Sequence, residues 1–268
     1  MTDILKYKGK RCVVTGAASG MGAACVKTLM SLGAEVYAMD VQDIKENVTQ
    51  SFKVDLLSQE SIDSVVADLP DEIDCLFNCA GLPGEPRFTN LDTCIVNIVA
   101  LRHLTEALIP RIRKGGAISS ITSVAGMSYT KNQKTVDEFL ETPDFAAAKK
   151  WCEDNPSLAN GYMFSKQAIV GYTYREAGKL AKQGIRINCL SPAPTDTPMM
   201  DAFHETLPKE LMDEHFQSPI GRNAVPEEMA EPLVLLNSEA SRFISGINLF
   251  VDFGYTAQVF CGQRISLV

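Results

Sequence analysis

The sequence predicts an α/β protein built on a doubly wound, mainly parallel sheet. Short apolar runs with β-branched character alternate along the chain with amphipathic stretches, which is the pattern of successive βαβ units. The 268 residues are 46% hydrophobic, enough to bury one large core, and no repeat, low-complexity tract or linker marks a boundary. We therefore expect residues 1–268 to form a single domain.

The individual elements follow from this alternation. We expect strands at Arg11–Thr15, Glu35–Asp40, Ser51–Asp55, Asp74–Asn78, Ala117–Ile121, Ile185–Leu190 and Ile247–Val251. We expect helices between them at roughly Met21–Leu32, Gln59–Asp68, Leu91–Ile112, Gly161–Lys182 and Pro226–Leu236. Ligands of such sheets bind beyond the carboxyl ends of the strands, so the segments that follow the strands are the informative ones.

Residues 127–160 form one segment beyond the minimal alternation, a helical insert before the helix at Gly161–Lys182. Thr142-Pro143-Asp144 predicts a helix start with Pro143 in the first helical position, and Asn155-Pro156 predicts its end. One face of this helix carries Phe145, Ala148 and Cys152, with Trp151 nearby. The insert therefore has an apolar side with which it can dock.

Residues 198–221 form the second such segment, which we take as the substrate-loop region. Its apolar residues recur at near-helical spacing, at Met199, Met200, Phe203, Leu207, Leu211, Met212 and Phe216. Met127 of the insert adds a further thioether to this apolar set, and methionine adapts well to irregular ligands. The composition suits a bulky alicyclic molecule such as a steroid or a terpenoid, although ordinary core-facing helices carry similar stripes.

Composition and charge exclude several function classes. The formal net charge is −8, so no cationic field is available to hold a nucleic acid. No apolar run approaches the ~18 residues of a membrane span, and the N-terminus lacks a targeting pattern, so we expect a cytoplasmic protein without membrane contact. The eight cysteines contain no CxxC pair and the three histidines are isolated, which favours reduced thiols and no metal site.

The first strand runs into the glycine-rich segment Gly16-Ala17-Ala18-Ser19-Gly20-Met21-Gly22, which then opens a helix. Glycine at Gly16 permits a tight turn, Gly20 permits close approach of a pyrophosphate, and Gly22 permits close packing of the helix on the strand. The free N–H groups at the helix start favour phosphate binding. Glycines also occur in ordinary turns, but this position between strand and helix predicts a Rossmann-like dinucleotide site.

Asp40 closes the second strand and predicts the cofactor. A carboxylate at this position can accept hydrogen bonds from the adenosine ribose hydroxyls, and it repels a 2′-phosphate. No Lys or Arg lies within the glycine loop or directly after Asp40. We therefore expect NAD rather than NADP, with a turn-forming role for Asp40 as the alternative.

Tyr162 and Lys166 form a Tyr-x-x-x-Lys pair on the predicted helix at Gly161–Lys182. The i to i+4 spacing places the phenol and the ammonium on one face. Alone, such a pair is most often a surface contact. Other polar residues strengthen the prediction of a catalytic role, because Ser123 follows the fifth strand and Asn97 lies in the fourth helix.

Taken together, these motifs resemble the classical short-chain dehydrogenase/reductase family over nearly the whole chain. The matching elements are the glycine loop, Asp40, Asp55, Asn78-Cys79-Ala80-Gly81, Asn97, Ser123, Tyr162, Lys166 and Pro192 through Thr197. The insert and the turn at Thr195-Asp196-Thr197-Pro198-Met199 look most like the bacterial 3α-hydroxysteroid dehydrogenase/carbonyl reductases. The resemblance implies an oxidoreductase that interconverts a secondary alcohol and a ketone, and a homo-oligomer, either a dimer or a tetramer.

The resemblance also implies the roles of individual residues. Tyr162 would be the general acid/base, Ser123 would hydrogen-bond the substrate oxygen, and Lys166 would lower the pKa of the phenol and hold the nicotinamide ribose. Asn97 would support a water that links Lys166 to solvent. The implied cofactor site comprises Gly16, Ser19, Gly20, Met21, Gly22, Asp40, Asp55, Leu56, Asn78, Ala80, Gly81, Tyr162, Lys166, Thr195 and Thr197.

Two departures from the family pattern bear on these expectations. Ala193 stands where the family usually has glycine after the sixth strand, and Phe253 replaces the first of two glycines near the C-terminus. Phe253 would pack at a subunit interface or fill a gap in its own subunit. The competing functions are a dehydrogenase of a terpenoid or other small cyclic alcohol, and a non-catalytic NAD-binding sensor.

Overall fold

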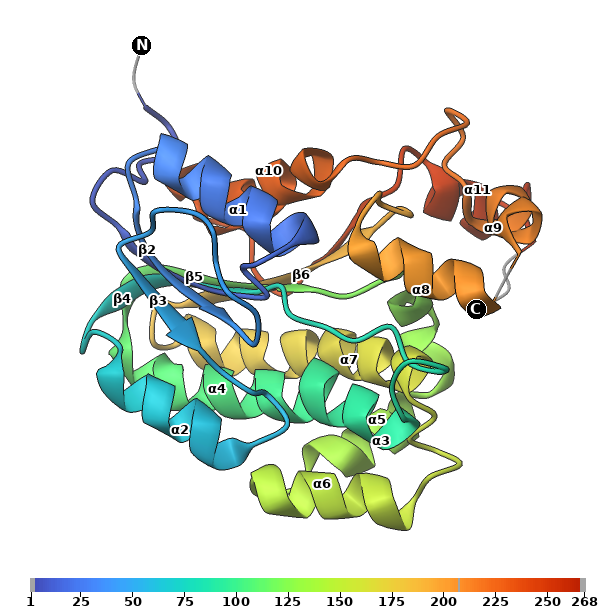
Figure 1. The fold of residues 1–268 in the computed structure, drawn as a ribbon, viewed down its shortest axis with the longest axis horizontal. Coiled ribbons are helices and arrows are strands. Elements are labelled where there is room, and N and C mark those ends of the chain that lie inside the picture. Colours follow the sequence, from blue (N-terminus) through green and yellow to red (C-terminus); the bar gives the residue numbers. More distant parts are fainter. Residues whose placement is uncertain (1–2, 207, 266–268) are drawn as a thin grey trace.

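The computed structural model describes residues 3–206 and 208–265, and the expected parallel sheet is present in it. Seven strands pair in parallel in the order β3-β2-β1-β4-β5-β6-β7 (Figure 1). Their bounds are β1 Arg11–Thr15, β2 Glu35–Asp40, β3 Gln50–Lys53, β4 Ile73–Asn78, β5 Ile112–Ile121, β6 Arg186–Pro192 and β7 Asn248–Val251. β5 begins at Ile112 rather than Ala117, because Ile112 pairs with Ile73 ahead of a register shift in the β4–β5 ladder.

Helices cover both faces of the sheet and bury a separate core on each (Figure 1). α1 (Gly20–Ser31) and α10 (Pro226–Asn237) cover one face, and α2 (Gln59–Asp68), α4 (Leu101–Leu108) and α7 (Tyr162–Ala181) cover the other. Successive strand residues point to opposite faces, so the neighbours Leu76 and Phe77 belong to different cores. This arrangement is the Rossmann-like fold that the sequence predicts.

The chain reverses its direction of winding between β1 and β4. From β1 it proceeds outward to β2 and β3, and it then returns to form β4 on the other side of β1. The segments leaving β1 and β4 therefore part at their carboxyl ends and open a crevice between them. The glycine loop after Thr15 and the Asn78-Cys79-Ala80-Gly81 motif form the two sides of this crevice.

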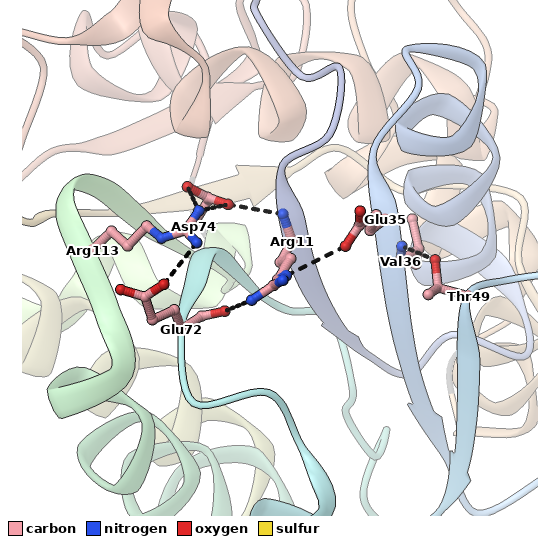
Figure 2. A network of polar contacts seen from close by, with 7 residues as sticks. All are labelled: Arg11, Glu35, Val36, Thr49, Glu72, Asp74 and Arg113. Atoms are coloured by element: carbon pink, nitrogen blue, oxygen red, sulfur yellow. Dashed lines mark hydrogen bonds and ion pairs between the residues drawn. The ribbon is translucent and has the colours of Figure 1, made fainter.

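Charged pairs join the strands at the end of the sheet where the strands begin (Figure 2). The Arg11 backbone N–H donates to Asp74, and its guanidinium reaches Glu35 and the Glu72 carbonyl. Arg113 pairs with Glu72 at 2.8 Å and with Asp74 at 3.5 Å. These contacts tie four neighbouring strands together at the end opposite the crevice.

The predicted fourth helix is present but changes its winding. It consists of α3 (Asn90–Cys94), a π-helical stretch η1 (Ile95–Ala100), α4 and the 3-10 turn η2 (Ile109–Arg111). By length and composition, Asn90–Arg111 is the one helical run among the described residues that could cross a membrane, yet most of it is buried inside the protein. It is a core helix, and its wider π-helical turn contains Asn97.

The insert folds as a series of short helices packed against α7. The 3-10 helix η3 (Val124–Lys131) leads into α5 (Gln133–Leu140), which we did not expect, and into the predicted helix α6 (Phe145–Asp154). The predicted start of α6 was wrong, because Asp144 is the N-cap and accepts a hydrogen bond from the Ala147 N–H at 2.8 Å. Pro143 therefore lies before the helix.

The docking face predicted for α6 is buried as expected. Phe145, Ala148 and Cys152 are each at most 6% exposed, and Trp151 stacks on Phe164 of α7 with ring centroids 5.5 Å apart. α6 thus lies outside the layer formed by α4 and α7 (Figure 1). The packing gives the insert a fixed place on the core.

The substrate-loop region is helical, as its spacing predicts. It forms α8 (Pro198–Thr206) and α9 (Lys209–Phe216), while Leu207 lies outside the described residues. A further helix, α11 (Tyr255–Phe260), follows β7 and was not expected. Phe253, just before α11, is 70% exposed, so it does not fill a gap in its own subunit.

Candidate active site

The glycine loop forms the floor of a cleft at the crevice. Gly16 has a left-handed φ of +68°, and a Cβ atom at Gly16 would lie 2.7 Å from the backbone of Ala80. A Cβ atom at Gly22 would lie 2.0 Å from the carbonyl oxygen of Gly16. Both positions therefore require glycine, and the closeness that they permit brings the loop directly beside the segment after β4.

The start of α1 faces this cleft with free donors. Ser19 is the N-cap, yet its side chain makes no capping hydrogen bond, and the first turn carries no acidic residue. The first N–H groups of a helix have no partner within the helix and carry partial positive charge. Together with the glycine cradle, these free donors fit the pyrophosphate of a dinucleotide.

Asp40 lies at the end of β2 on the wall of the same cleft. Its carboxylate accepts hydrogen bonds from the Ala18 N–H at 2.9 Å and the Gln42 N–H at 2.8 Å. The two contacts fix the carboxylate beside the glycine loop. The only other charged residue among the described lining residues of the cleft is Asp55, so the wall carries no positive charge.

The cleft has a volume of about 400 Å³ and contains most of the predicted cofactor residues. These are Gly16, Ser19, Gly20, Met21, Gly22, Asp40, Asp55, Leu56, Ala80, Gly81 and Thr197. Asn78 lies behind the wall, where its buried side chain donates to the hydroxyls of Thr105 and Ser120. Thr195 lies in the adjoining pocket, and there its hydroxyl donates to the Ala193 carbonyl.

Cys79, Pro198 and Met199 also line this cleft, although the sequence indicated them only as parts of a family motif or of the substrate-loop region. Lining residues that were not singled out in the sequence include Val41 and Gln42 directly after β2, Leu82 after β4, and Phe88. Their positions directly after strands are a signal that could have found several of them. Phe88 carries no such signal, because the path of a long connection decides its placement.

Ser123, Tyr162 and Lys166 come together from two elements. Ser123 follows β5, and Tyr162 is the first residue of α7, with Lys166 one turn further along the helix. The Lys166 ammonium lies 5.4 Å from the centre of the Tyr162 ring and donates to the Ile121 carbonyl at 3.1 Å. The Thr122 hydroxyl also donates to the Lys166 carbonyl at 2.8 Å, which joins α7 to the end of β5.

Burial sets the protonation of this group. Burial raises the pKa of Tyr162 above its ordinary value, and a hydrogen bond with Ser123 opposes the rise. Burial also lowers the pKa of Lys166 to about 8, because the low-dielectric surroundings disfavour its charge. The phenol is therefore protonated in the protein alone, and further positive charge beside it would be needed to form the phenolate.

Asn97 is fully buried and holds the segment after β4. Its side-chain oxygen accepts from the Leu82 N–H at 2.7 Å, and its amide donates to the Leu82 carbonyl at 3.0 Å and to Ser165 at 3.1 Å. A Cβ atom at Gly81 would lie 3.3 Å from the Asn97 oxygen and 3.6 Å from the Lys166 ammonium. Asn97, Gly81 and Lys166 thus meet at one point.

A second pocket of about 350 Å³ opens directly above Ser123 and Tyr162. Methionine and phenylalanine dominate its wall, at Met21, Met163, Met199, Met200, Phe203, Met212 and Phe216, and Ala193 adds its methyl group. The described lining residues include no charged side chain. Met21, Thr197 and Met199 line both pockets, so the two adjoin beside Tyr162.

The arrangement suits proton transfer at a substrate oxygen, with hydride transfer that a dinucleotide in the adjoining cleft would supply. One cleft suits a dinucleotide, the other suits an uncharged apolar molecule, and a phenol with a hydroxyl partner lies between them. Among residues 3–206 and 208–265, no cluster of three or more His, Cys, Asp or Glu side chains is suited to hold a metal.

Comparison with known proteins finds dehydrogenases and reductases along most of the chain. A family model described as short chain dehydrogenase matches residues 10–135, and one described as Enoyl-(Acyl carrier protein) reductase matches residues 152–256. A coniferyl-alcohol dehydrogenase of a Pseudomonas species is 32% identical over 256 residues, covering 93% of this chain and 98% of the relative. The 3-alpha-hydroxysteroid dehydrogenase/carbonyl reductase of Comamonas testosteroni is 28% identical over 258 residues, covering 91% and 96%.

A solved structure shares the fold. The 3-alpha-hydroxysteroid dehydrogenase of a Pseudomonas species, complexed with NADH, superposes with a TM-score of 0.77 at 24% identity, covering 96% of this chain and 100% of that one. The expected resemblance is thereby confirmed. The chain belongs to the short-chain dehydrogenase/reductase family, and it is an oxidoreductase.

Proposed function

We propose that this oxidoreductase uses NAD(H) to interconvert an uncharged, bulky, largely apolar cyclic alcohol and its carbonyl product. The observation that carries the proposal is the meeting of Ser123, Tyr162 and Lys166 where the dinucleotide cleft joins the apolar pocket. The proposal includes residues 1–268 acting as one catalytic domain of a cytoplasmic homo-oligomer. The near-complete coverage of this chain and its relatives supports the single domain.

In the proposed mechanism, Tyr162 moves the proton at the substrate oxygen. During oxidation the phenolate takes the alcohol proton, and during reduction the phenol returns it. Ser123 donates a hydrogen bond to the same oxygen, which positions it and stabilises charge that develops there. When NAD(H) is bound, its nicotinamide supplies the hydride chemistry.

Lys166 has the supporting role in this mechanism. Its buried ammonium, 5.4 Å from the phenol ring, favours the phenolate electrostatically, and it lies within reach of a ribose in the adjoining cleft. We propose that Asn97 fixes the Gly81–Leu82 backbone beside Lys166 and supports a water that carries the proton to solvent. The mutual hydrogen bonds of Asn97 with Leu82 support this role.

The preference for NAD over NADP rests on the electrostatics of the cleft. A 2′-phosphate would lie near the fixed Asp40 carboxylate in a wall whose described residues supply no cation. The ribose hydroxyls of NAD, by contrast, can donate to this carboxylate. The negative charge of Asp40, with no cation nearby among the described lining residues, therefore favours NAD over NADP.

The substrate class rests on the second pocket. Its volume lies at the lower end of the range for small-molecule sites, about 300–1,000 Å³, and its wall is rich in thioethers and aromatic rings. A hydroxysteroid is our leading candidate, and a terpenoid or another small cyclic alcohol is the alternative. An aromatic alcohol is a second candidate, supported by the 32% identical coniferyl-alcohol dehydrogenase and by favourable contacts of sulfur with aromatic rings.

The test is a substrate panel with purified protein. A 3α-hydroxysteroid, borneol, coniferyl alcohol and a small diol are each assayed with NAD+ and with NADP+. We expect turnover with NAD+ of the hydroxysteroid or borneol, which test the cyclic alcohol, or of coniferyl alcohol, which tests the aromatic candidate, and a lower kcat/KM with NADP+. Turnover of the diol alone would contradict the substrate class, and NADH binding without any turnover would favour the non-catalytic sensor.

A further inference from the structure

An ion pair joins the connection after β4 to the last turn of α8, two segments that each contribute residues to the dinucleotide cleft. Arg87 lies in the connection between β4 and α3, and Glu205 lies in the last turn of α8. The Arg87 Nε donates to the two Glu205 oxygens at 3.1 and 3.0 Å, and its Nη2 donates to Glu205 at 2.5 Å. This two-pronged geometry is the strong form of an arginine–carboxylate contact.

Both segments form walls of the cleft. Leu82 and Phe88 of the connection that carries Arg87 line the cleft, and so do Pro198 and Met199 at the start of α8, whose last turn carries Glu205. No backbone ladder joins the two sides, because the connection after β4 and α8 have no strand in common. Their separation therefore depends on side-chain contacts, and among the described residues Arg87 with Glu205 is the one ion pair between them.

α8 also carries groups that reach the reaction centre. The ring of Phe203 packs edge-on against the Tyr162 ring, with centroids 5.2 Å apart. Met199, at the other end of the helix, lines both pockets. A contact that fixes α8 therefore fixes the boundary of the dinucleotide cleft and the cover of Tyr162 together.

We propose that Arg87 and Glu205 are positioning residues that latch α8 over the cofactor cleft, and that opening of this latch governs the release of NADH. The proposal rests on the proposed NAD(H) dependence of the enzyme. Neither side chain touches the reacting atoms, and both are partly exposed, at 39% and 45%, so the pair can open without unfolding the core. Salt would weaken the latch, because exposed charges are screened.

The experiment measures the latch and the release of NADH separately. Hydrogen exchange of the amides in residues 198–206 is followed in cofactor-free protein, and NADH release is followed by stopped-flow fluorescence. Arg87→Met and Glu205→Gln each remove one charge, and the double variant R87E/E205R restores a pair of opposite polarity. The matched control is Arg113→Met, which breaks a similarly exposed pair with Glu72 at the amino edge of the sheet (Figure 2).

We expect faster exchange in residues 198–206 and an NADH release rate about threefold higher in both single variants, since an exposed ion pair contributes modestly. R87E/E205R should return both the exchange rate and the NADH release rate most of the way to the wild-type values. Arg113→Met should change neither rate. In the wild type, added salt should raise the release rate, while Arg87→Met should lose this salt dependence.

The outcomes separate this proposal from the proposed function. Unchanged exchange in Arg87→Met, or an equal change in Arg113→Met, would overturn the latch. Faster exchange with unaltered NADH release would overturn its control of release. Wild-type protein that fails to bind NADH would contradict the proposed function and with it control of NADH release, while the exchange measurement would still decide whether the latch exists.

Discussion

The two pockets differ in what builds their walls. The dinucleotide cleft is built from the ends of β1, β2 and β4 and the start of α1, whose backbones are fixed by the sheet and by glycines that admit no side chain. The apolar pocket adds to the ends of β5 and β6 a wall from α8 and α9, whose flexible side chains Met199, Met200, Phe203, Met212 and Phe216 line it. Backbone geometry defines the first pocket, and side-chain packing defines the second.

This difference bears on how each pocket selects its ligand. A rigid cleft with fixed N–H groups and a fixed carboxylate selects one cofactor by placing charges. A pocket lined by thioethers adapts its shape to several apolar rings. We therefore expect substitutions in the cleft to have large, specific effects on cofactor use, and substitutions in the pocket to have smaller effects spread over many substrates.

Gly22→Ala should give the largest effect on the rigid cleft. Its Cβ atom would lie 2.0 Å from the Gly16 carbonyl oxygen, so the loop must move. Overpacking of about 1–3 kcal/mol corresponds to an NADH Kd raised by up to about 100-fold, measured by fluorescence titration. Gly178→Ala, at a helical glycine of α7 with open space around it, is the control and should leave the Kd unchanged. Equal Kd values for the two variants would contradict the close packing of the loop.

Asp40→Asn tests the electrostatic part of the comparison. The amide keeps the shape and can still accept from the Ala18 N–H, but it carries no charge. We expect the ratio of kcat/KM for NAD+ to that for NADP+ to fall by about tenfold to 100-fold, since hydrogen bonds to charged groups contribute about 1.5–3 kcal/mol. Adding Gln42→Arg should reverse the preference. An unchanged ratio would show that Asp40 does not select the cofactor.

Phe203→Leu tests the adaptable pocket. Leucine keeps an apolar surface but loses the edge-on contact with the Tyr162 ring, so we expect the KM for a cyclic alcohol to rise about fivefold. The Kd for NADH should change less than twofold, because Phe203 does not line the cleft among its described residues. A large loss of NADH affinity would show that Phe203 also shapes the dinucleotide cleft.

Lys166→Met should give a small gain in stability, the smallest of these effects, and the size of the gain should depend on pH. At pH 7 the lysine is charged in both the folded and the unfolded state, and burial penalises that charge, which is why its folded pKa is about 8. Removing it should raise Tm by a few degrees, corresponding to about 1 kcal/mol. Calorimetry should show the higher Tm, and an activity assay should show a loss of turnover.

The sign of the pH dependence follows from the lowered pKa. Between about pH 8 and the ordinary lysine value of about 10.5, the unfolded state binds more protons than the folded state, so wild-type stability rises with pH through this window. The advantage of Lys166→Met should therefore shrink across the same window. An advantage that stays constant from pH 7 to 10.5 would contradict the buried charge.

The sheet and the cleft could be predicted from the sequence because local patterns encode them. Gly16 follows β1 directly, Gly22 lies in the first turn of the next helix, α1, and Asp40 is the last residue of β2, so the strand order nearly fixes their neighbours in space. The predicted N-cap of α6 was wrong because Thr142 and Asp144, two positions apart, both suit that position. In the fold the Thr142 hydroxyl is engaged elsewhere, since it accepts from Arg102 and donates to the Phe139 carbonyl.

Other features of the site depend on contacts between distant segments. Arg87 and Glu205 are 118 positions apart, and no local pattern pairs them. The sequence also could not show that burial raises the pKa of Tyr162, against the lowering expected from Lys166. The motif indicates a nearby ammonium but not how little water surrounds the phenol. The pairing of Asn97 with Leu82 likewise needs the fold.

Tyr162→Phe tests the central claim most directly, because it removes one oxygen from the point where the two pockets join. The phenol acts in the proton transfer, whose loss costs about 10²-fold to 10⁴-fold in rate. We predict that single-turnover oxidation of a cyclic alcohol by NAD+ slows by at least about 100-fold while the Kd for NADH stays within twofold of the wild type. Single-turnover oxidation at the wild-type rate in this variant would contradict the account.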